Sequence, residues 1–379
     1  MNHLFFYTIA AGGQSKPEYG YTGVWLQSGT ITVSSAWTMS AAVITAGSAQ
    51  YIFDSGLAVE CILSGGSVNI SSGGICSSMT IYTGPTYVYT GGIVYSATIS
   101  GNAGIAALAG AYVQDLVLAA ADARITVYSG GSAANIAVAA AGSVTVFGSV
   151  ADVTVSAGAL YVSNGGSAVG ATISGGNIWV SSGGNVANVS TYGGGIVVVN
   201  GGSAYDITMS GGGCTVYAGG FASNVTIWKA GIPTIYGIAV DVVYRNPTSR
   251  IEVKSSAGAA AGGVISNFTL YTGIVWCQQH GLVDTGTVSG GQIYVFNSGS
   301  AQNITINGGG VSVYTGGILS GAFVQSAAKL TAVNTGIVYN PVISSAGSLV
   351  VGSGGTALSV VSNTGAVVIV SAGGSITYA

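Results

Sequence analysis

Charged side chains are scarce in this sequence of 379 residues. Lys and Arg together number 7 and Asp and Glu 10, so only 4% of the residues carry a charge, whereas an ordinary soluble domain has about 25%. A formal net charge of −3 gives no basic patch for nucleic acid and little repulsion between molecules. The outer surface must therefore be covered by Ser, Thr, Asn and Gly, by sugar, or by neighbouring copies of the protein. This composition is typical of an extracellular or assembled protein.

The sequence also lacks what helices, membrane spans and metal sites require. No helical periodicity of apolar residues is present, and no apolar run approaches the ~20 residues that cross a membrane. His3 and His280 lie far apart, and the turns lack the Asp of calcium-binding nonapeptides. The four cysteines, none in a CxxC spacing, are Cys61, Cys76, Cys214 and Cys277. We therefore expect no disulfide framework, no metal site and no cofactor.

Glycine, in contrast, is abundant, with 64 residues against 5 prolines, and it marks a repeat. From Asn177 to Ile227 the chain reads NIWVSSGGNVANVSTYGGG, IVVVNGGSAYDITMSGGG and CTVYAGGFASNVTI. Each phrase alternates apolar with Thr or Ser residues between Gly-rich turns, which is the period of a strand. Ile207 and Met209 should then point to one face and Thr208 to the other. The same alternation places Cys61, Cys76 and Cys214 in strands. A fixed period near 20 with this alternation is typical of a solenoid in which each repeat is one coil.

One position of the repeat can be followed through the chain at spacings of 17 to 20 residues, with one exception of 26. Its predicted occupants are Ala42, Glu60, Ser78, Ala97, Asp115, Asn135, Asp152, Ala171, Asn188, Asp206, Asn224, Asp241, Asn267, Thr285, Asn303, Ala322, Asn340 and Ser359. The fold class that follows is all-β: a single β-solenoid (β-helix) of about eighteen coils with an N-terminal cap. Residues 1–23, rich in aromatics and outside the repeat, are the predicted cap, and residues 24–379 the repeat domain.

The two ends of the sequence bear on association. No positively charged segment precedes Leu4-Phe5-Phe6, so the start does not read as a secretion signal. The last residues, up to Ala379, are still inside the repeat. A terminal coil without a cap offers unpaired strand edges to another chain. This pattern predicts homotypic association, including end-to-end stacking.

The acidic residues follow the repeat and admit two interpretations. Five of them share the position traced above with six asparagines, and no two acids occupy it in neighbouring coils. An amide can then donate to the carboxylate beside it, forming a polar ladder. The alternative is a glycosidase pair, since Asp115 and Asp152, two coils apart, would be roughly 9.6 Å from one another, at the edge of the inverting range. The ladder also accounts for the asparagines, and we favour it.

Aromatic residues form a second outward row, beside the strand that reads V-x-S-G-G. Such a row either stacks on itself or offers a flat strip for sugar rings or for a partner. The residues predicted to form this interaction face are Tyr89, Tyr128, Trp179, Tyr217, Trp276, Tyr294 and Tyr314. The one cluster of charges, Arg245, Arg250, Glu252 and Lys254, belongs to the coil that is about eight residues too long. We expect a bulging loop there, around Asn246-Pro247, without a functional site.

The phrases SGGNVANVSTYGGG, NGGSAYDITMSGGG and AGGFASNVTI resemble the repeats of AIDA-type self-associating autotransporter adhesins of Gram-negative bacteria. The resemblance covers nearly all coils after about residue 40. It implies a secreted β-helical passenger that mediates adhesion, aggregation and biofilm formation, with heptose added to serines by a dedicated transferase. The sequence departs from that family in having no recognisable signal peptide and in its Tyr, Trp and Cys content.

These observations predict a non-enzymatic, extracellular or cell-surface β-solenoid that acts as an adhesin or self-associating structural protein. Its expected partners are itself and host or bacterial surface glycans, with O-glycosylation of serines, no nucleic acid and no membrane span. Two alternatives remain open. One is the subunit of an end-to-end filament, and the other is a carbohydrate-active solenoid such as a phage tailspike or a pectinase-like hydrolase. An enzyme should gather carboxylates and basic groups in one cleft, whereas an adhesin repeats its chemistry along the coils, as this sequence does.

Overall fold

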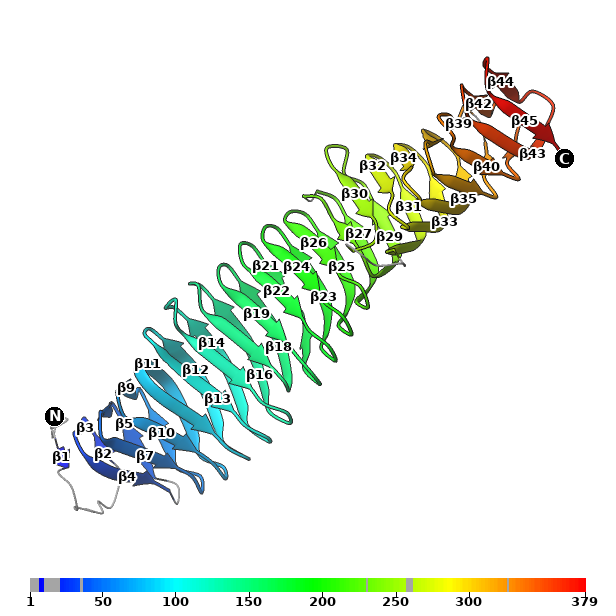
Figure 1. The fold of residues 1–379 in the computed structure, drawn as a ribbon. Coiled ribbons are helices and arrows are strands. Elements are labelled where there is room, and N and C mark those ends of the chain that lie inside the picture. Colours follow the sequence, from blue (N-terminus) through cyan, green and yellow to red (C-terminus); the bar gives the residue numbers. More distant parts are fainter. Residues whose placement is uncertain (1–6, 10–20, 35–36, 230, 257–261, 326) are drawn as a thin grey trace. The chain divides into compact units, whose positions relative to one another are not determined.

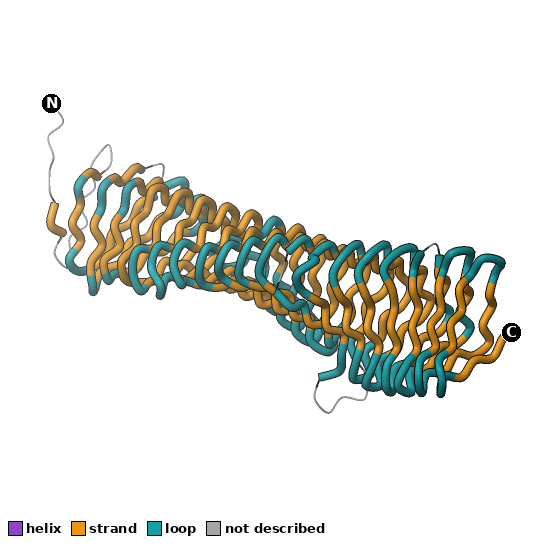
Figure 2. The backbone as a smooth tube through the Cα atoms, turned by 90° about the horizontal axis from the view of Figure 1, so that it is seen from above, coloured by secondary structure: helices purple, strands orange, loops and turns teal. Residues whose placement is uncertain are grey.

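The computed structural model describes residues 7–9, 21–34, 37–229, 231–256, 262–325 and 327–379. Contacts divide the chain into two units, residues 1–187 and 188–379, and the division falls within strand β23 (Asn185–Thr191). Every regular element in these residues is a β-strand, and Figure 2 shows strands alternating with short turns in each unit. No helix that could cross a membrane occurs among them. The predicted cap, residues 1–23, lies mostly outside the described residues.

The first unit is a succession of parallel strands, which follow one another in chain order in Figure 1. They are β1 (Tyr7–Ile9), β2 (Tyr21–Thr22), β3 (Val24–Leu26), β4 (Gly29–Val33), β5 (Thr38–Ser40), β6 (Val43–Thr45), β7 (Ser48–Ile52), β8 (Leu57–Val59), β9 (Ile62–Ser64), β10 (Ser67–Ile70), β11 (Ile75–Val88), β12 (Ile93–Ile99), β13 (Ala103–Ala107), β14 (Tyr112–Leu118), β15 (Arg124–Val127), β16 (Ser132–Val138), β17 (Ser143–Val146), β18 (Ser149–Val155), β19 (Ala159–Val162), β20 (Ser167–Val169), β21 (Thr172–Ile173) and β22 (Asn177–Val180).

The second unit repeats the same arrangement. Its strands after β23 are β24 (Gly195–Val198), β25 (Ser203–Met209), β26 (Gly213–Val216), β27 (Phe221–Ile227), β28 (Thr234–Ile235), β29 (Ile238–Tyr244), β30 (Arg250–Val253), β31 (Val264–Leu270), β32 (Ile274–Cys277), β33 (Leu282–Val288), β34 (Gln292–Val295), β35 (Ser300–Ile306), β36 (Gly310–Val313), β37 (Ile318–Ser320), β38 (Phe323–Val324), β39 (Lys329–Ala332), β40 (Ile337–Tyr339), β41 (Val342–Ile343), β42 (Ser348–Val351), β43 (Thr356–Ser362), β44 (Val367–Val370) and β45 (Ser375–Tyr378).

Each coil consists of a longer strand bent at one corner and a shorter strand that follows a turn. The bent strand β25 pairs in parallel with β27 in the next coil, Ala204 opposite Ala222 and Ile207 opposite Val225. The short strand β26 pairs in the same way with β24 and β28. In these described strands each coil hydrogen-bonds to the coils before and after it, which is the arrangement of a solenoid. The predicted all-β solenoid is confirmed.

The alternation of side chains builds the core. Ile207 and Met209 are fully buried, whereas Thr208 between them is exposed. The short strands contribute Val198 and Val216, which are also fully buried. Strand after strand, the inward position is Val, Ile, Leu or Ala, so that each coil stacks its apolar residues on those of the next. Burial of this apolar surface is the main favourable term for the fold.

The corner within each bent strand is made by one residue in the left-handed conformation. There are nineteen such corners in the described residues: Gly23, Ala41, Glu60, Ser78, Ser96, Asp115, Asn135, Asp152, Gly170, Asn188, Asp206, Asn224, Asp241, Asn267, Thr285, Asn303, Gly321, Asn340 and Ser359. Gly, Asn and Asp tolerate positive φ better than other residues, which explains their frequency here. The predicted position was wrong by one residue in four coils. Ala42, Ala97, Ala171 and Ala322 are buried, and the corner is the residue before each.

Glycine is favoured at both positions of the Gly-Gly turn, for a different physical reason at each. In the turn after β26, Gly219 has a φ of +78°, which residues with a Cβ rarely adopt. A Cβ on Gly220 would lie 2.8 Å from the backbone oxygen of Val198 in the preceding coil. The turn is closed by a hydrogen bond of 2.8 Å from the Gly220 N–H to the Tyr217 carbonyl. Glycine thus allows successive turns to stack.

The long coil between Asp241 and Asn267 differs from the prediction in where its extra residues lie. Ten residues separate β30, which ends at Val253, from β31, which begins at Val264, whereas four separate β26 from β27. Asn246 and Pro247 lie in the other turn of the coil, between β29 and β30. Most of the added length is therefore at 254–263, of which residues 257–261 are outside the described residues.

Candidate functional site

The seven aromatic residues of the predicted interaction face occupy two rows instead of one. Trp179, Trp276 and Tyr294 stand at the outward position in the middle of a short strand. Three others, Tyr128, Tyr217 and Tyr314, follow directly after a short strand, two positions further along the outer face, and Tyr89 follows the end of the long strand β11. Both rows point outward because side chains two apart in a strand share a face. Tyr89, Tyr128, Trp179 and Tyr217 are exposed, whereas Trp276, Tyr294 and Tyr314 are half-buried.

The rings form local groups. In the first unit Tyr128 stacks on Phe147 with ring centroids 6.3 Å apart. In the second unit Tyr217 stacks on Tyr236 at 5.8 Å. Such pairs add a modest stabilisation beyond the area that they bury. Stacking therefore accounts for these residues without a ligand.

A different arrangement occurs at the coils of β32, β34 and β36. Trp276 and Phe296 meet edge to face at 5.7 Å, and Tyr294 leans toward Tyr314 at 6.0 Å. These rings border a hollow of about 570 Å³, which we call the Trp276 groove. Its lining residues are Ile274, Trp276, Tyr294, Phe296, Asn297, Tyr314, Thr315 and Asn334. The hollow is wide open to solvent, so a ligand would lie on it without being enclosed.

The polar rim of the Trp276 groove comes from the turns after the short strands. Asn297 and Asn334 have φ values of +48° and +51°, so each takes a left-handed position that suits asparagine. The Thr315 hydroxyl donates a 2.7 Å hydrogen bond to the backbone oxygen of Asn334. Sequence reasoning missed both asparagines as site residues. The available signal was the pair of turns Asn297-Ser298-Gly299 and Asn334-Thr335-Gly336, each of which follows a short strand.

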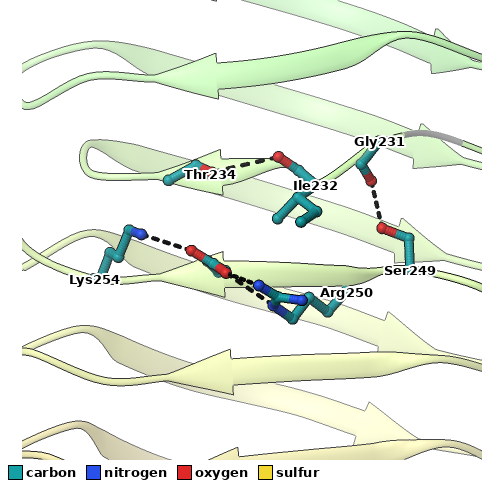
Figure 3. Close-up of polar contacts among 7 residues, drawn as sticks. Gly231, Ile232, Thr234, Ser249, Arg250 and Lys254 are labelled. Atoms are coloured by element: carbon teal, nitrogen blue, oxygen red, sulfur yellow. Dashed lines mark hydrogen bonds and ion pairs between the residues drawn. The ribbon is translucent and has the colours of Figure 1, made fainter.

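Beside this groove lies a compact group of charges on β30 and the turn that follows it. The carboxylate of Glu252 accepts hydrogen bonds from Arg250, at 2.8 Å from Nε and 2.5 Å from Nη2. It also accepts one of 2.6 Å from Lys254 Nζ, so that the two cations reach it from opposite sides (Figure 3). Both ion pairs found in the described residues involve Glu252. Burial raises the pKa of the Glu252 carboxyl, but the hydrogen bonds and charges of Lys254 and Arg250 outweigh it, and the pKa is lowered.

Each of these cations also lies over an aromatic ring. The Arg250 guanidinium carbon is 4.0 Å from the centre of the Trp276 ring, and Lys254 Nζ is 5.7 Å from that of Tyr236. Glu252 is paired in register with Trp276. The charge cluster is therefore part of the aromatic surface. The bulging loop was expected around Asn246-Pro247, and that placement was wrong.

Arg245, predicted as a fourth member of the cluster, lies elsewhere. Its guanidinium carbon is 3.8 Å from the centre of the Tyr271 ring and 5.0 Å from that of Trp228. Those residues follow the bent strands of the neighbouring coils, so Arg245 is held between them by cation–π contacts.

The corner positions contain the predicted amide–carboxylate pairs. Asn135 donates to Asp115 at 2.8 Å, Asn224 donates to Asp206 at 2.6 Å, and Asn267 donates to Asp241. Asn303 donates at 3.2 Å to Asp284, which precedes the corner residue Thr285. In each pair the amide of one coil binds the carboxylate of the coil before it. The pairs are exposed, so they form a polar edge on the surface instead of a buried ladder.

A shallow polar trough of about 310 Å³ runs along this edge in the second unit. Its lining residues are Asn188, Ser190, Asp206, Thr208, Asn224 and Thr226. It contains one carboxylate, so it does not offer the acid–base pair that glycoside hydrolysis uses. The predicted glycosidase pair, Asp115 and Asp152, lies on two coils with the coil of Asn135 between them. The side-chain amide of Asn135 is hydrogen-bonded to the Asp115 carboxylate.

The four cysteines are buried as free thiols. Cys76, Cys214 and Cys277 lie in strands, whereas Cys61 lies just before β9; the predicted placement was therefore wrong for Cys61, and Cys277 should have been included. Burial raises the pKa of Cys214 to about 12. Burial likewise raises the pKa of Cys277 to about 12, although backbone hydrogen bonds oppose it. Among the residues that the structure describes, no three His, Cys, Asp or Glu side chains converge as they would around a metal ion.

Comparison with known proteins gives matches among solved structures. No protein-family model matches the chain, and no curated protein matches it. A solved structure does. It is the crystal structure of a fragment of TibA that is hyper-glycosylated by TibC, with 26% identical residues over 95% of this chain and 100% of that chain, and a TM-score of 0.28. With this TM-score the match carries no argument about the fold or the site, which rest on the strand pairings and contacts described above.

Proposed function

We propose that this protein is a non-enzymatic, extracellular β-solenoid that acts by binding through its side faces, as an adhesin or a self-associating structural protein. The observation that carries the proposal is that exposed chemistry recurs from coil to coil. The corners repeat amide–carboxylate pairs such as Asn224 with Asp206, and the short strands repeat outward aromatic rings. A catalytic site gathers unlike groups around one reacting atom, whereas a repeated surface suits many weak contacts with a repetitive partner.

Two features of the composition support an extracellular setting. With 4% charged residues the surface depends on hydroxyl and amide side chains for hydration. The resemblance of the repeats to AIDA-type adhesin passengers points the same way, and it extends the proposal to sugar attached to exposed Ser and Thr side chains. The exposed Thr208 and the half-buried Thr226, one coil apart on the bent strands, are examples of hydroxyl groups that a glycosyltransferase could modify.

The test of this function uses two assays on the same purified protein. Beads coated with the protein should aggregate with one another or adhere to cells, while a panel of polysaccharides should remain uncleaved. Hydrolysis that Asp115→Asn or Asp152→Asn abolishes, in a folded variant, would replace the proposal with the carbohydrate-active alternative. Beads that stay single and adhere to nothing would also contradict it.

A further inference from the structure

The Trp276 groove is a shallow, open hollow on the aromatic surface. Along the short strands, Trp276 and Tyr294 are in register in successive coils, and the next position is Ser312. The row of large rings therefore ends at Tyr294, and the next coil has the small side chain of Ser312 at this position. Phe296 and Tyr314, two positions after Tyr294 and Ser312, form the other side. The space between these rings is about 570 Å³, whereas Tyr128 and Tyr217 each stack directly on a neighbour.

The chemistry of the lining is aromatic with a polar rim and no charge. Three of the lining residues, Asn297, Thr315 and Asn334, carry amide or hydroxyl groups, and none of the eight is ionisable as an acid or a base near neutral pH. Within the described residues, the side-chain amides of Asn297 and Asn334 make no hydrogen bond to another residue. Aromatic faces bind flat apolar surfaces, and amides donate to and accept from hydroxyl groups. The ligand that presents both is a pyranose ring, with C–H groups on its faces and hydroxyl groups around its edge.

The spacing of the coils favours a chain of such rings. Strands of neighbouring coils are ~4.8 Å apart, which is close to the advance of one sugar residue in an extended oligosaccharide. Trp276, Tyr294 and Tyr314 come from three successive coils. Trp276 and Tyr294 can therefore meet two successive sugar residues at the same position of the coil, and Tyr314 can meet a third from the adjacent row.

Charge decides which oligosaccharide fits. Arg250, which contacts the Trp276 ring, and Lys254 are both bound to Glu252. Lys329 lies at the start of β39, the strand before the turn that supplies Asn334. Arg250 also covers one side of the Trp276 ring at 4.0 Å, so it fixes the ring and leaves little free charge for an acidic sugar. We propose that the Trp276 groove binds a neutral oligosaccharide whose rings carry equatorial substituents, a proposal that rests on the adhesin function above and names its ligand. Trp276 and Tyr294 are its stacking surfaces, Asn297 and Asn334 bind hydroxyl groups, and Arg250 is a positioning residue.

The binding experiment is isothermal titration calorimetry of the full chain with three hexasaccharides. Cellohexaose is neutral with equatorial substituents, maltohexaose is neutral but curved, and hexagalacturonate is acidic. We expect cellohexaose to bind and the other two to bind more weakly. Trp276→Ala and Tyr294→Ala should each weaken cellohexaose binding about tenfold or more, as for an anchoring aromatic residue. The matched control Tyr217→Ala removes an equivalent ring from a stacked pair outside the groove, and binding should be unchanged.

Two more variants keep the test informative if an aromatic substitution disturbs folding. Asn334→Gly retains the positive φ of this turn and should weaken binding about fivefold through loss of one amide contact. Arg250→Gln should weaken cellohexaose binding without creating affinity for hexagalacturonate. Tighter binding of hexagalacturonate than of cellohexaose would overturn the assignment of a neutral ligand.

The outcomes also separate this inference from the proposed function. If coated beads aggregate but cellohexaose does not bind, or binds equally well to Trp276→Ala and Tyr217→Ala, the groove proposal is overturned and the proposed function stands. If cellohexaose binds as expected while beads neither aggregate nor adhere, the adhesin function is overturned and the groove remains a glycan site. If Trp276→Ala abolishes dimers seen in sedimentation and no hexasaccharide binds, the occupant is a second copy of this chain and the glycan proposal is wrong.

Discussion

The side-chain amide of Asn224 donates a hydrogen bond of 2.6 Å to the carboxylate of Asp206, one coil before it on the same left-handed corner. Asn224 itself has a φ of +52°. Two demands therefore meet at one residue, since the backbone needs positive φ and the neighbouring carboxylate needs a donor. Asparagine satisfies both, and this explains why the repeat alternates Asn and Asp at this corner.

Two substitutions at Asn224 should separate these demands. Asn224→Gly keeps the conformation and loses the amide, so we expect the free energy of unfolding to fall by about 0.5–1 kcal/mol, the contribution of an exposed hydrogen bond. Asn224→Ala keeps a Cβ at positive φ but lacks the polar side chain that lets asparagine tolerate this conformation, which costs roughly 1 kcal/mol more. Urea denaturation of the two variants measures the difference. Equal stability of Asn224→Ala and the wild type would contradict this account of the corner.

The Gly-Gly turn offers a second pair of substitutions. Gly220→Ala should destabilise the protein by about 1–3 kcal/mol, as overpacking does, because its Cβ would lie 2.8 Å from the Val198 backbone oxygen. Gly213→Ala is the matched control, since a Cβ there meets nothing within 4 Å. It should leave the stability unchanged or raise it slightly. The melting temperatures of both variants test the prediction, and a larger loss in Gly213→Ala would refute it.

The ion pairs of Glu252 predict a pH dependence. Because the folded-state pKa of Glu252 is lowered, its carboxylate stabilises the fold above the unfolded value of about 4.3, and this contribution is lost as the pH falls through the folded value. Glu252→Gln should therefore reduce stability by about 1–2 kcal/mol at pH 7, between the values for exposed and buried pairs. The difference from the wild type should shrink below about pH 4. Glu60→Gln, at an exposed corner, is the control. A difference that stays constant down to pH 3 would show that Glu252 does not act through its charge.

The buried cysteines predict a chemical result. Burial raises the pKa of Cys214 and Cys277 to about 12, and the thiolate is the reactive form. At pH 8 Cys214 and Cys277 should therefore not react with a thiol reagent such as dithionitrobenzoate in the folded protein. The hydrogen bond with Cys76 lowers the pKa of Cys61, but Cys61 is fully buried, so the reagent should not reach it. After denaturation all four free thiols should react. A thiol that reacts rapidly in the folded protein, or fewer than four after denaturation, would contradict the buried, unpaired arrangement.

The sequence was sufficient for the fold because its strand alternation is strict. Ile207 and Met209 are buried and Thr208 is exposed, as the alternation predicts. The corner was misplaced at Ala97 because spacing does not distinguish it from Ser96, since each lies 18 or 19 residues from the corners Ser78 and Asp115. Its neighbour Ser96 has the positive φ, and the buried Ala97 continues the inward row.

The Trp276 groove could be predicted only in part. Trp276 and Tyr294 were found from the sequence because they recur at the outward position of the repeat. The groove itself depends on the contact of Trp276 with Phe296 in the next coil and on the tilt of Tyr294 toward Tyr314. Those are choices of side-chain rotamer, which spacing alone does not determine. Arg250 was assigned to a loop because its position over the Trp276 ring also depends on packing between coils.

The central claim is that the protein binds through its repeated side faces. Sedimentation velocity of the unglycosylated wild type over a range of concentrations tests its self-associating form most directly. A single variant that carries Tyr128→Lys and Tyr217→Lys places charge on exposed aromatic positions in both units, and like charges oppose association. We predict larger species at higher concentration for the wild type, and monomers for the variant. A wild type that sediments as a monomer at every concentration, or a variant that associates as the wild type does, would contradict the claim.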